Sequence, residues 1–86
     1  MIIWTSKSWE EFVYIYEHDQ RLVKRVIKLI KDIERSSYSG IGKPEPLRGD
    51  LFGYWSRRID SKNRIVYKME SGCVKIVQCG THYGDK

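Results

Sequence analysis

The sequence predicts an α+β fold in which two helices pack on one face of a mostly antiparallel sheet. Three observations support this class. Apolar residues recur with the spacing of amphipathic helices between residues 8 and 33. Glycines and prolines between residues 40 and 46 then end the helical region. Residues 54–83 carry three β-rich segments separated by turn residues. A chain of 86 residues has room for one domain, which we expect to span residues 1–86.

The N-terminal region is predicted to form a short strand followed by a helix. Residues 1–5 include two isoleucines and a tryptophan, which favour a pleated and buried setting. Ser8 and Glu11 have the spacing of a capping box, in which the two residues satisfy each other's free backbone N–H groups at the helix start. One apolar stripe follows at positions i, i+3, i+4 and i+7, formed by Trp9, Phe12, Val13 and Tyr16.

A second, longer helix is predicted to begin after Asp19, whose carboxylate can accept hydrogen bonds from the free N–H groups of the first turn. Its buried face is expected to consist of Leu22, Val26, Ile30 and Ile33, widened by Val23, Ile27 and Leu29. A basic stripe on the same helix is formed by Arg21, Lys24, Lys28, Lys31 and Arg35. A solvated helix face explains this stripe more simply than a surface that contacts a polyanion such as RNA, and both explanations stay open.

The C-terminal half is predicted to form a three-stranded meander, with strands at residues 54–59, 64–70 and within 73–83. The first strand must join this sheet beside one of the three. In the last strand the apolar residues fall on both sides, since Val74 and Ile76 argue for one face and Val77 and Cys79 for the other. A β-bulge would explain this pattern, and the face of His82 stays open.

Alternation along the middle strands makes a prediction about three arginines. If Ile65 and Tyr67 face the helices, Arg58 and Arg64 emerge together on the opposite, open face of the sheet. Arg57 then points inward. We expect it to lie near the sheet edge, where its aliphatic stem lets the charged group reach water.

The balance of charge indicates an anionic partner. Sixteen Lys and Arg residues against eleven Asp and Glu give a net charge of +5 and a pI near 9.3. Residues 48–86 hold eight basic and four acidic groups, so most of the positive field comes from that half.

Several classes of protein are excluded by what the sequence lacks. No apolar run approaches the roughly 20 residues of a membrane-spanning helix, and the N-terminus has no signal-peptide pattern. Cys73 and Cys79 lie too far apart in one predicted strand for a disulfide, so we expect reduced thiols. His18 and His82 have no zinc-like spacing. We therefore expect a cytoplasmic protein without membrane association, metal or cofactor.

Four residues could carry acid–base chemistry on a phosphodiester. Glu45 lies between two prolines, which hold its backbone extended; a stiff linker is the simpler explanation, and a rigidly presented general base the functional one. Arg58 and Arg64 suit phosphate contacts, although a solvated hairpin face is an equal alternative. His82 is the one histidine of the basic half, and it suits protonation of a leaving oxygen if it is not merely a surface group. Together they fit metal-free RNA cleavage by 2′-hydroxyl attack.

Six segments also carry a resemblance to a known family: Ile3-Trp4, Ser8-Trp9, Gly42-Lys43-Pro44-Glu45-Pro46-Leu47, Gly53-Tyr54-Trp55-Ser56-Arg57-Arg58-Ile59, Arg64-Ile65-Val66-Tyr67 and His82-Tyr83. They resemble the YoeB (Txe) family, which are RelE-like toxins of type II toxin–antitoxin systems. The resemblance runs from about residue 2 to residue 83, nearly the whole chain.

The resemblance implies a microbial-RNase-like fold and a ribosome-dependent mRNA endoribonuclease that inhibits translation. It implies that Glu45 is the general base and His82 the general acid. It implies further that Arg64 stabilises the transition state and that Tyr83 is the closing tyrosine of the site. No metal ligands and no cofactor are implied.

Substrate contacts and partners follow from the same resemblance. A family position that is commonly lysine falls on Arg48, where a planar guanidinium replaces the point charge. The residues themselves add Lys43 and Arg58 as cations and Trp55 as a ring that could stack on an unpaired base, which completes the expected set of substrate and phosphate contacts. The implied partners are mRNA in the ribosomal A site, the ribosome and a YefM/Phd-like antitoxin, and a homodimer is allowed.

Two other functions fit the same basic face. A non-catalytic RNA- or ribosome-binding module would also bind RNA in a salt-dependent way, but only the enzyme would create new 3′ ends. A protein-binding subunit would hold an acidic peptide, and replacement of His82 would leave its effect unchanged.

Overall fold

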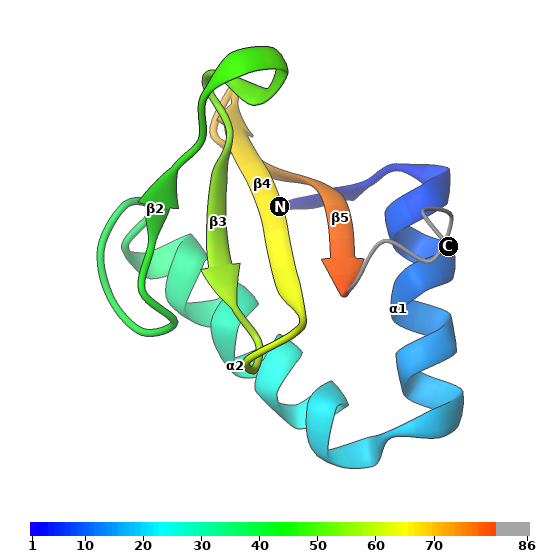
Figure 1. Ribbon diagram of the computed structural model, residues 1–86. Helices are drawn as coiled ribbons and strands as arrows, with labels where there is room; N and C mark the ends of the chain where they lie inside the picture. Colours follow the sequence, from blue (N-terminus) through cyan, green and yellow to red (C-terminus); the bar gives the residue numbers. More distant parts are fainter. Residues whose placement is uncertain (81–86) are drawn as a thin grey trace.

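The computed structural model describes residues 1–80 and confirms the expected α+β class (Figure 1). The helices precede most of the sheet, and a single turn of 3₁₀ helix lies between the second and third strands. In chain order the elements are β1 (Ile2–Trp4), α1 (Ser6–His18), α2 (Gln20–Arg35), β2 (Glu45–Pro46), η1 (Gly49–Leu51), β3 (Trp55–Arg58), β4 (Arg64–Glu70) and β5 (Cys73–Gly80).

The strands form one mixed sheet in the order β1-β5-β4-β3-β2. β1 runs parallel to β5, and every other neighbouring pair is antiparallel. The first strand thus joins the sheet beside the last described one, as a sheet edge. Residues 45–46, which were expected to be extended, form the opposite edge (Figure 1). We call the face of the sheet away from the helices the open face.

The start of α1 differs from the prediction, because the capping box lies three residues earlier. Thr5 is the N-cap: its Oγ1 accepts from the N–H of Ser8 at 3.1 Å, and the Oγ of Ser8 accepts from the N–H of Thr5 at 3.0 Å. Ser8 therefore takes the role expected of Glu11. The helix starts earlier because Ser8 is fully buried, with its hydroxyl also 2.7 Å from the carbonyl oxygen of Ile76 in β5.

The buried face of α1 also differs from the predicted apolar stripe. Trp9 and Tyr16 are about half exposed, whereas Ser8, Glu11 and Ile15 are buried. Glu11 is buried because its Oε1 accepts a hydrogen bond of 2.8 Å from the backbone N–H of Cys79 near the end of β5. A buried carboxylate with a partner is tolerated, and here it joins the helix to the strand that leads to residues 81–86.

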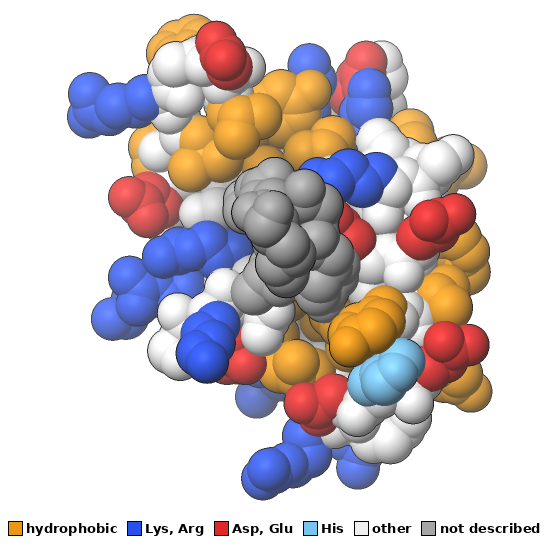
Figure 2. Space-filling model, turned by 45° about the vertical axis from the view of Figure 1, so that its right-hand side comes forward, with side chains coloured by type: hydrophobic (Ala, Val, Ile, Leu, Met, Phe, Trp, Pro, Cys, Tyr) orange, Lys and Arg blue, Asp and Glu red, His pale blue; other side chains and the backbone are white. Residues whose placement is uncertain are grey.

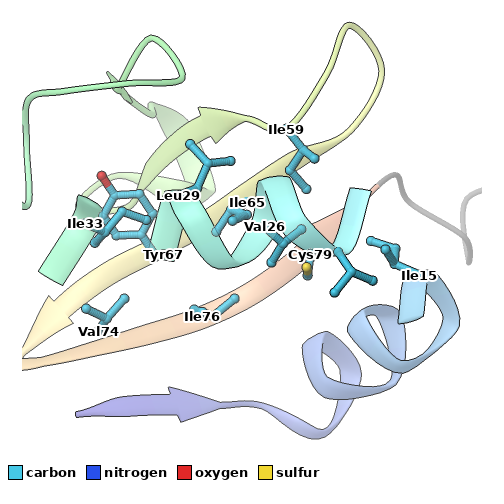
Figure 3. Close-up of a cluster of buried hydrophobic side chains, with 11 residues drawn as sticks. Ile15, Val26, Leu29, Ile33, Ile59, Ile65, Tyr67, Val74, Ile76 and Cys79 are labelled. Atoms are coloured by element: carbon cyan, nitrogen blue, oxygen red, sulfur yellow. The ribbon is translucent and has the colours of Figure 1, made fainter. Parts of the chain in front are cut away.

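The second helix and its Asp19 cap are confirmed, since the Asp19 carboxylate accepts from the N–H groups of Arg21 and Leu22. Ile27, expected to widen the buried face, is 43% exposed. The apolar face of α2 packs on the sheet (Figure 3). The core consists of Ile15, Val23, Val26, Leu29, Ile33, Ile59, Ile65, Tyr67, Val74, Ile76 and Cys79.

A β-bulge in β5 resolves the mixed pattern of that strand. Tyr67 pairs with Ile76, but the next residue of β4, Val66, pairs with Gln78, so Val77 is an extra residue. The bulge brings Cys79 to the core side and turns Gln78 to the open face. Both cysteines are free, and burial raises the pKa of Cys79 to about 12.

Arg57 points inward as predicted, but the expectation that it reaches water at the sheet edge is wrong. Its side chain has no exposed surface. The α2–β2 loop (residues 36–44) closes over it and offers three carbonyl oxygens. The guanidinium donates to Asp32 Oδ2 (2.6 Å), Tyr67 Oη (3.2 Å) and the carbonyl oxygens of Ser36 (2.6 Å), Ser39 (2.9 Å) and Ile41 (3.0 Å).

The Arg57 guanidinium is tightly packed on all sides that the loop and the core provide. Gly40 lies against the Asp32 carboxylate with a φ of +125°, so any side chain at this position would collide with it. The Tyr67 hydroxyl donates onward to the carbonyl oxygen of Ser37 at 2.6 Å. The hydrogen bond from Arg57 is the main cause that lowers the pKa of Asp32 below its ordinary value of 3.8.

Within residues 1–80, neither helix is long and apolar enough to cross a membrane.

We expect Arg57→Lys to destabilise the fold strongly, although it keeps the charge. A lysine cannot reproduce the fork of donors that serves three loop carbonyls, and removal of one partner of a buried pair typically costs about 3–5 kcal/mol. Chemical denaturation measures the free energy of unfolding. The matched control is Arg58→Lys at the exposed neighbour, where a change within about 0.5 kcal/mol is expected. A stable Arg57→Lys protein would contradict this account of the loop.

Acid should weaken the fold through Asp32. A carboxyl whose pKa is lowered in the folded state stabilises the fold above its unfolded pKa, and this contribution is lost as the pH falls through the folded value. Denaturation from pH 6 down to pH 2 should therefore show a fall in stability below about pH 4. This fall should be smaller in Asp32→Asn, whereas Asp50→Asn, at an exposed carboxylate, should follow the wild type. Parallel curves for wild type and Asp32→Asn would disprove the assignment.

Candidate active site

The candidate active site is a cleft on the open face of the sheet, with a volume of about 240 Å³. We call it the open-face cleft. Strands β2, β3, β4 and β5 all contribute to it, and the β2–β3 connection supplies an apolar wall. The residues that line it are Glu45, Leu47, Leu51, Ser56, Arg64, Val66 and Gln78.

Four of the lining residues form a row across the sheet. Glu45 in β2 is opposite Ser56 in β3, Ser56 is opposite Val66 in β4, and Val66 is opposite Gln78 in β5. Neighbouring strands lie about 4.8 Å apart, so this row spans the cleft from the sheet edge inward. The bulge at Val77 is what places Gln78 in the row. The cleft therefore has a carboxylate at one end and a buried amide at the other.

Glu45 is held at the sheet edge by backbone pairing on both sides. The N–H of Leu47 donates to the carbonyl oxygen of Tyr54 (2.9 Å), and the N–H of Arg58 donates to the carbonyl oxygen of Gly42 (2.7 Å). Two flanking prolines fix φ and restrict the backbone between these bonds. The backbone that carries the exposed Glu45 side chain is thus fixed, while the carboxylate stays accessible.

Arg64 and Arg58 form the next row toward the end of the sheet. They are opposite each other in the antiparallel pair β3–β4, as the alternation predicted. Arg64 is half-buried and lines the cleft, whereas Arg58 is exposed and is not among the residues that line it. Like charges that face each other across a strand pair repel, so an anion bound between them would relieve that repulsion.

The charge around the cleft is positive. The lining itself holds one acidic residue, Glu45, and one basic residue, Arg64, so the positive excess comes from cations around the cleft such as Arg58. Another cation of the open face, Lys68, lies with its Nζ 5.1 Å from the centre of the Tyr54 ring. Figure 2, which views this side obliquely, shows Lys and Arg side chains gathered mostly at the left of the view. Such a field attracts phosphates.

The remaining predicted residues are not all brought to the cleft. Lys43 and Arg48 are exposed on either side of β2 in the sequence, and neither lines the cleft. Trp55 lies on the helix side of the sheet, where its ring packs against the core and against Tyr38, with ring centroids 4.8 Å apart and planes tilted by 41°. His82 and Tyr83 lie outside the described residues.

The sequence analysis did not predict five of the seven lining residues, and two of those five, Ser56 and Gln78, are polar. Ser56 lies inside the Trp-Ser-Arg-Arg run, in which the arginines carry the charge, and Gln78 lies in the last strand, whose sequence pattern fits both faces. The signal that could have found Ser56 was parity: it falls on the same side of its strand as Arg58. Gln78 could not be placed without the bulge. Its Nε2 donates to the carbonyl oxygen of Gly80 at 2.9 Å.

Among residues 1–80, no three His, Cys, Asp or Glu side chains gather closely enough to hold a metal ion.

Comparison with known proteins identifies the family. Residues 4–83 match the family described as the YoeB-like toxin of bacterial type II toxin–antitoxin systems. Toxin YoeB of Streptomyces coelicolor is 51% identical over 82 residues, which cover 95% of this chain and 98% of the relative. Two solved structures from Staphylococcus aureus are each 38% identical. A heterotetrameric YoeB–YefM complex gives a TM-score of 0.91 over 96% of this chain and 97% of that chain. A YoeB dimer gives 0.87 over 95% of each. The chain therefore belongs to the YoeB-like toxins.

Proposed function

We propose that this toxin is a ribosome-dependent mRNA endoribonuclease. The observation that carries the proposal is the presence of Glu45 and Arg64 in one cleft, with Glu45 at the edge end of the row of Ser56 and Val66 and Arg64 in the next row. A carboxylate and a guanidinium that line the same cleft are a base and a phosphate ligand, which cleavage by the 2′-hydroxyl requires. The net charge of +5 suits an RNA substrate.

The reaction uses one base, one acid and cations around the phosphate. Glu45 takes the proton of the 2′-hydroxyl as its oxygen attacks the adjacent phosphorus, and Arg64 stabilises the charge that develops on the phosphate oxygens. The bond from phosphorus to the 5′-oxygen breaks, and His82 gives that oxygen its proton; Tyr83 is the closing tyrosine of the site. The roles of His82 and Tyr83 rest on the family resemblance, because both lie outside the described residues.

The substrate contacts follow from where the cations lie. We assign Arg58, opposite Arg64, to the phosphate next to the cleavage site. Lys43 and Arg48, on either side of the edge strand, are assigned to more distant phosphates of the message. Trp55 is left out of this set, since its ring packs on the helix side of the sheet.

Two protein partners are part of the proposal. By analogy with the Staphylococcus aureus complex, the toxin assembles with a YefM-like antitoxin, and the dimer from the same organism makes self-association a second expected state. An acidic segment of the antitoxin would suit the positive field of the open face. Such a partner would block mRNA, which requires the same cations, and this would keep the toxin inactive in the cytoplasm.

Cleavage of a defined message during in vitro translation tests the proposal. Primer extension should reveal new ends with ribosomes present, and far fewer on the same RNA alone, because the ribosome fixes the message in the attack geometry. Arg64→Ala should fold normally and cut about 10²–10³-fold more slowly. The matched control is Arg21→Ala, an exposed arginine away from the cleft, which should cut like the wild type.

Two outcomes of this experiment contradict the proposal. Undiminished cutting by a folded Arg64→Ala protein would remove Arg64 from the site. Arrested translation without new ends would favour the non-catalytic module, or the protein-binding subunit if His82→Gln arrests translation equally well.

The chemistry of the product ends and the pH profile test the assignment of Glu45 as general base and His82 as general acid. The upstream fragment should end in a 2′,3′-cyclic phosphate, or in the 3′-phosphate from its hydrolysis, and the downstream fragment should begin with a 5′-hydroxyl. The rate should show a bell-shaped pH dependence, because one group must be ionised and the other protonated. Glu45→Gln should shift or abolish the acid limb and His82→Gln the basic limb. A 5′-phosphate on the downstream fragment would exclude 2′-hydroxyl attack.

A further inference from the structure

Ser56 has an unusual side chain in the floor of the open-face cleft. The residue is 1% exposed, and its Oγ has no hydrogen-bond partner among residues 1–80. Buried hydroxyl groups are almost always hydrogen-bonded, because burial without a partner costs the full penalty of removing the group from water. A buried hydroxyl that lines a cleft and lacks an internal partner is available to a ligand.

Ser8 shows how this chain treats a buried serine that serves the fold alone. It is equally buried, and its Oγ bonds the carbonyl oxygen of Ile76 in β5 at 2.7 Å and the N–H of Thr5 at 3.0 Å. Ser56 lies in the middle of the sheet, among backbone groups that the strand ladders already satisfy. Its hydroxyl therefore adds nothing to the hydrogen bonding of the fold.

The position of Ser56 relative to Glu45 defines what the hydroxyl can reach. The two residues are directly opposite in the β2–β3 pair, where side chains on one face lie about 5 Å apart. Arg64 is two residues from Val66, the other neighbour of Ser56, so it lies diagonally across the same face. A ligand group between Glu45 and Arg64 would thus lie over Ser56.

We propose that the Ser56 hydroxyl is a substrate-binding group of this site and donates a hydrogen bond to an oxygen of the RNA ribose-phosphate backbone beside Glu45. The inference rests on the proposed cleavage reaction and adds a residue to it. An ionised carboxylate only accepts hydrogen bonds and an arginine only donates, so a neutral hydroxyl adds a short, uncharged donor at the floor of the cleft. In this proposal Ser56 binds the substrate and is neither the general acid nor the general base.

Single-turnover cleavage of ribosome-bound message by Ser56→Ala tests the proposal. We expect the rate to fall about ten-fold or more, as loss of a hydrogen bond to a charged group predicts. The Tm should stay the same or rise, since an unpartnered buried hydroxyl is removed. Ser56→Cys, similar in shape but a weak donor, should be nearly as slow as Ser56→Ala. Both variants should keep the acid limb of the pH profile in place.

The matched control is Ser8→Ala, which should lower the Tm and leave the cleavage rate of the folded protein unchanged. Wild-type cleavage by Ser56→Ala or Ser56→Cys would overturn the proposal. A shifted acid limb would also overturn it, because Ser56 would then act through Glu45 and not on the substrate. Glu45→Gln separates the two hypotheses: if it is inactive while Ser56→Ala is fully active, the inference about Ser56 fails and the proposed function stands.

Discussion

The fold depends on one buried guanidinium. Arg57 has no exposed surface, so its positive charge must be neutralised inside the molecule. Asp32 from α2 supplies the counter-charge, and the α2–β2 loop supplies three carbonyl oxygens that would otherwise lack donors. The hydrogen bonds among the guanidinium, the carboxylate and the carbonyl oxygens thus offset the free-energy cost of removing these groups from water. The loop they fix leads directly into β2, which carries Glu45, so the edge of the cleft is set from the core.

One face of the sheet packs against the helices and the other lines the cleft, and the bulge at Val77 lets β5 contribute to both. On the helix side it lets Cys79 complete the apolar layer begun by Val74 and Ile76. On the open face it adds Gln78 to the polar row that starts at Glu45. The packing of β5 against the helices therefore determines which of its side chains point into the open-face cleft. The buried Glu11, bonded to the backbone of Cys79, fixes the end of this strand against α1.

Much of this could be predicted from the sequence, for reasons that are local. Amphipathic spacing gave α2, turn residues gave the meander, and strand alternation put Arg58 and Arg64 on one face. What failed depended on distant partners. The capping box lies at Thr5 and not at Ser8 because Ser8 bonds β5, 68 residues away. The full burial of Arg57 could not be predicted, because its carbonyl partners come from a loop without regular structure. The face of Gln78 could not be predicted either, because only the pairing with β4 defines the position of the bulge. The flanking prolines predict an extended backbone at Glu45, but they do not predict that Ser56 lies opposite it in the next strand.

The parallel pairing of β1 with β5 has a consequence for how the toxin is made. β1, the first described strand in chain order, pairs with β5, the last described one, so the sheet cannot close while β5 is still being synthesised. Contacts this distant in sequence form late, since loop closure must precede them. Before that point α2 lacks the strands that cover its apolar face, and the four strands that line the cleft are not assembled. A nascent chain therefore carries no formed cleft until β5 has been synthesised and has paired with its neighbours.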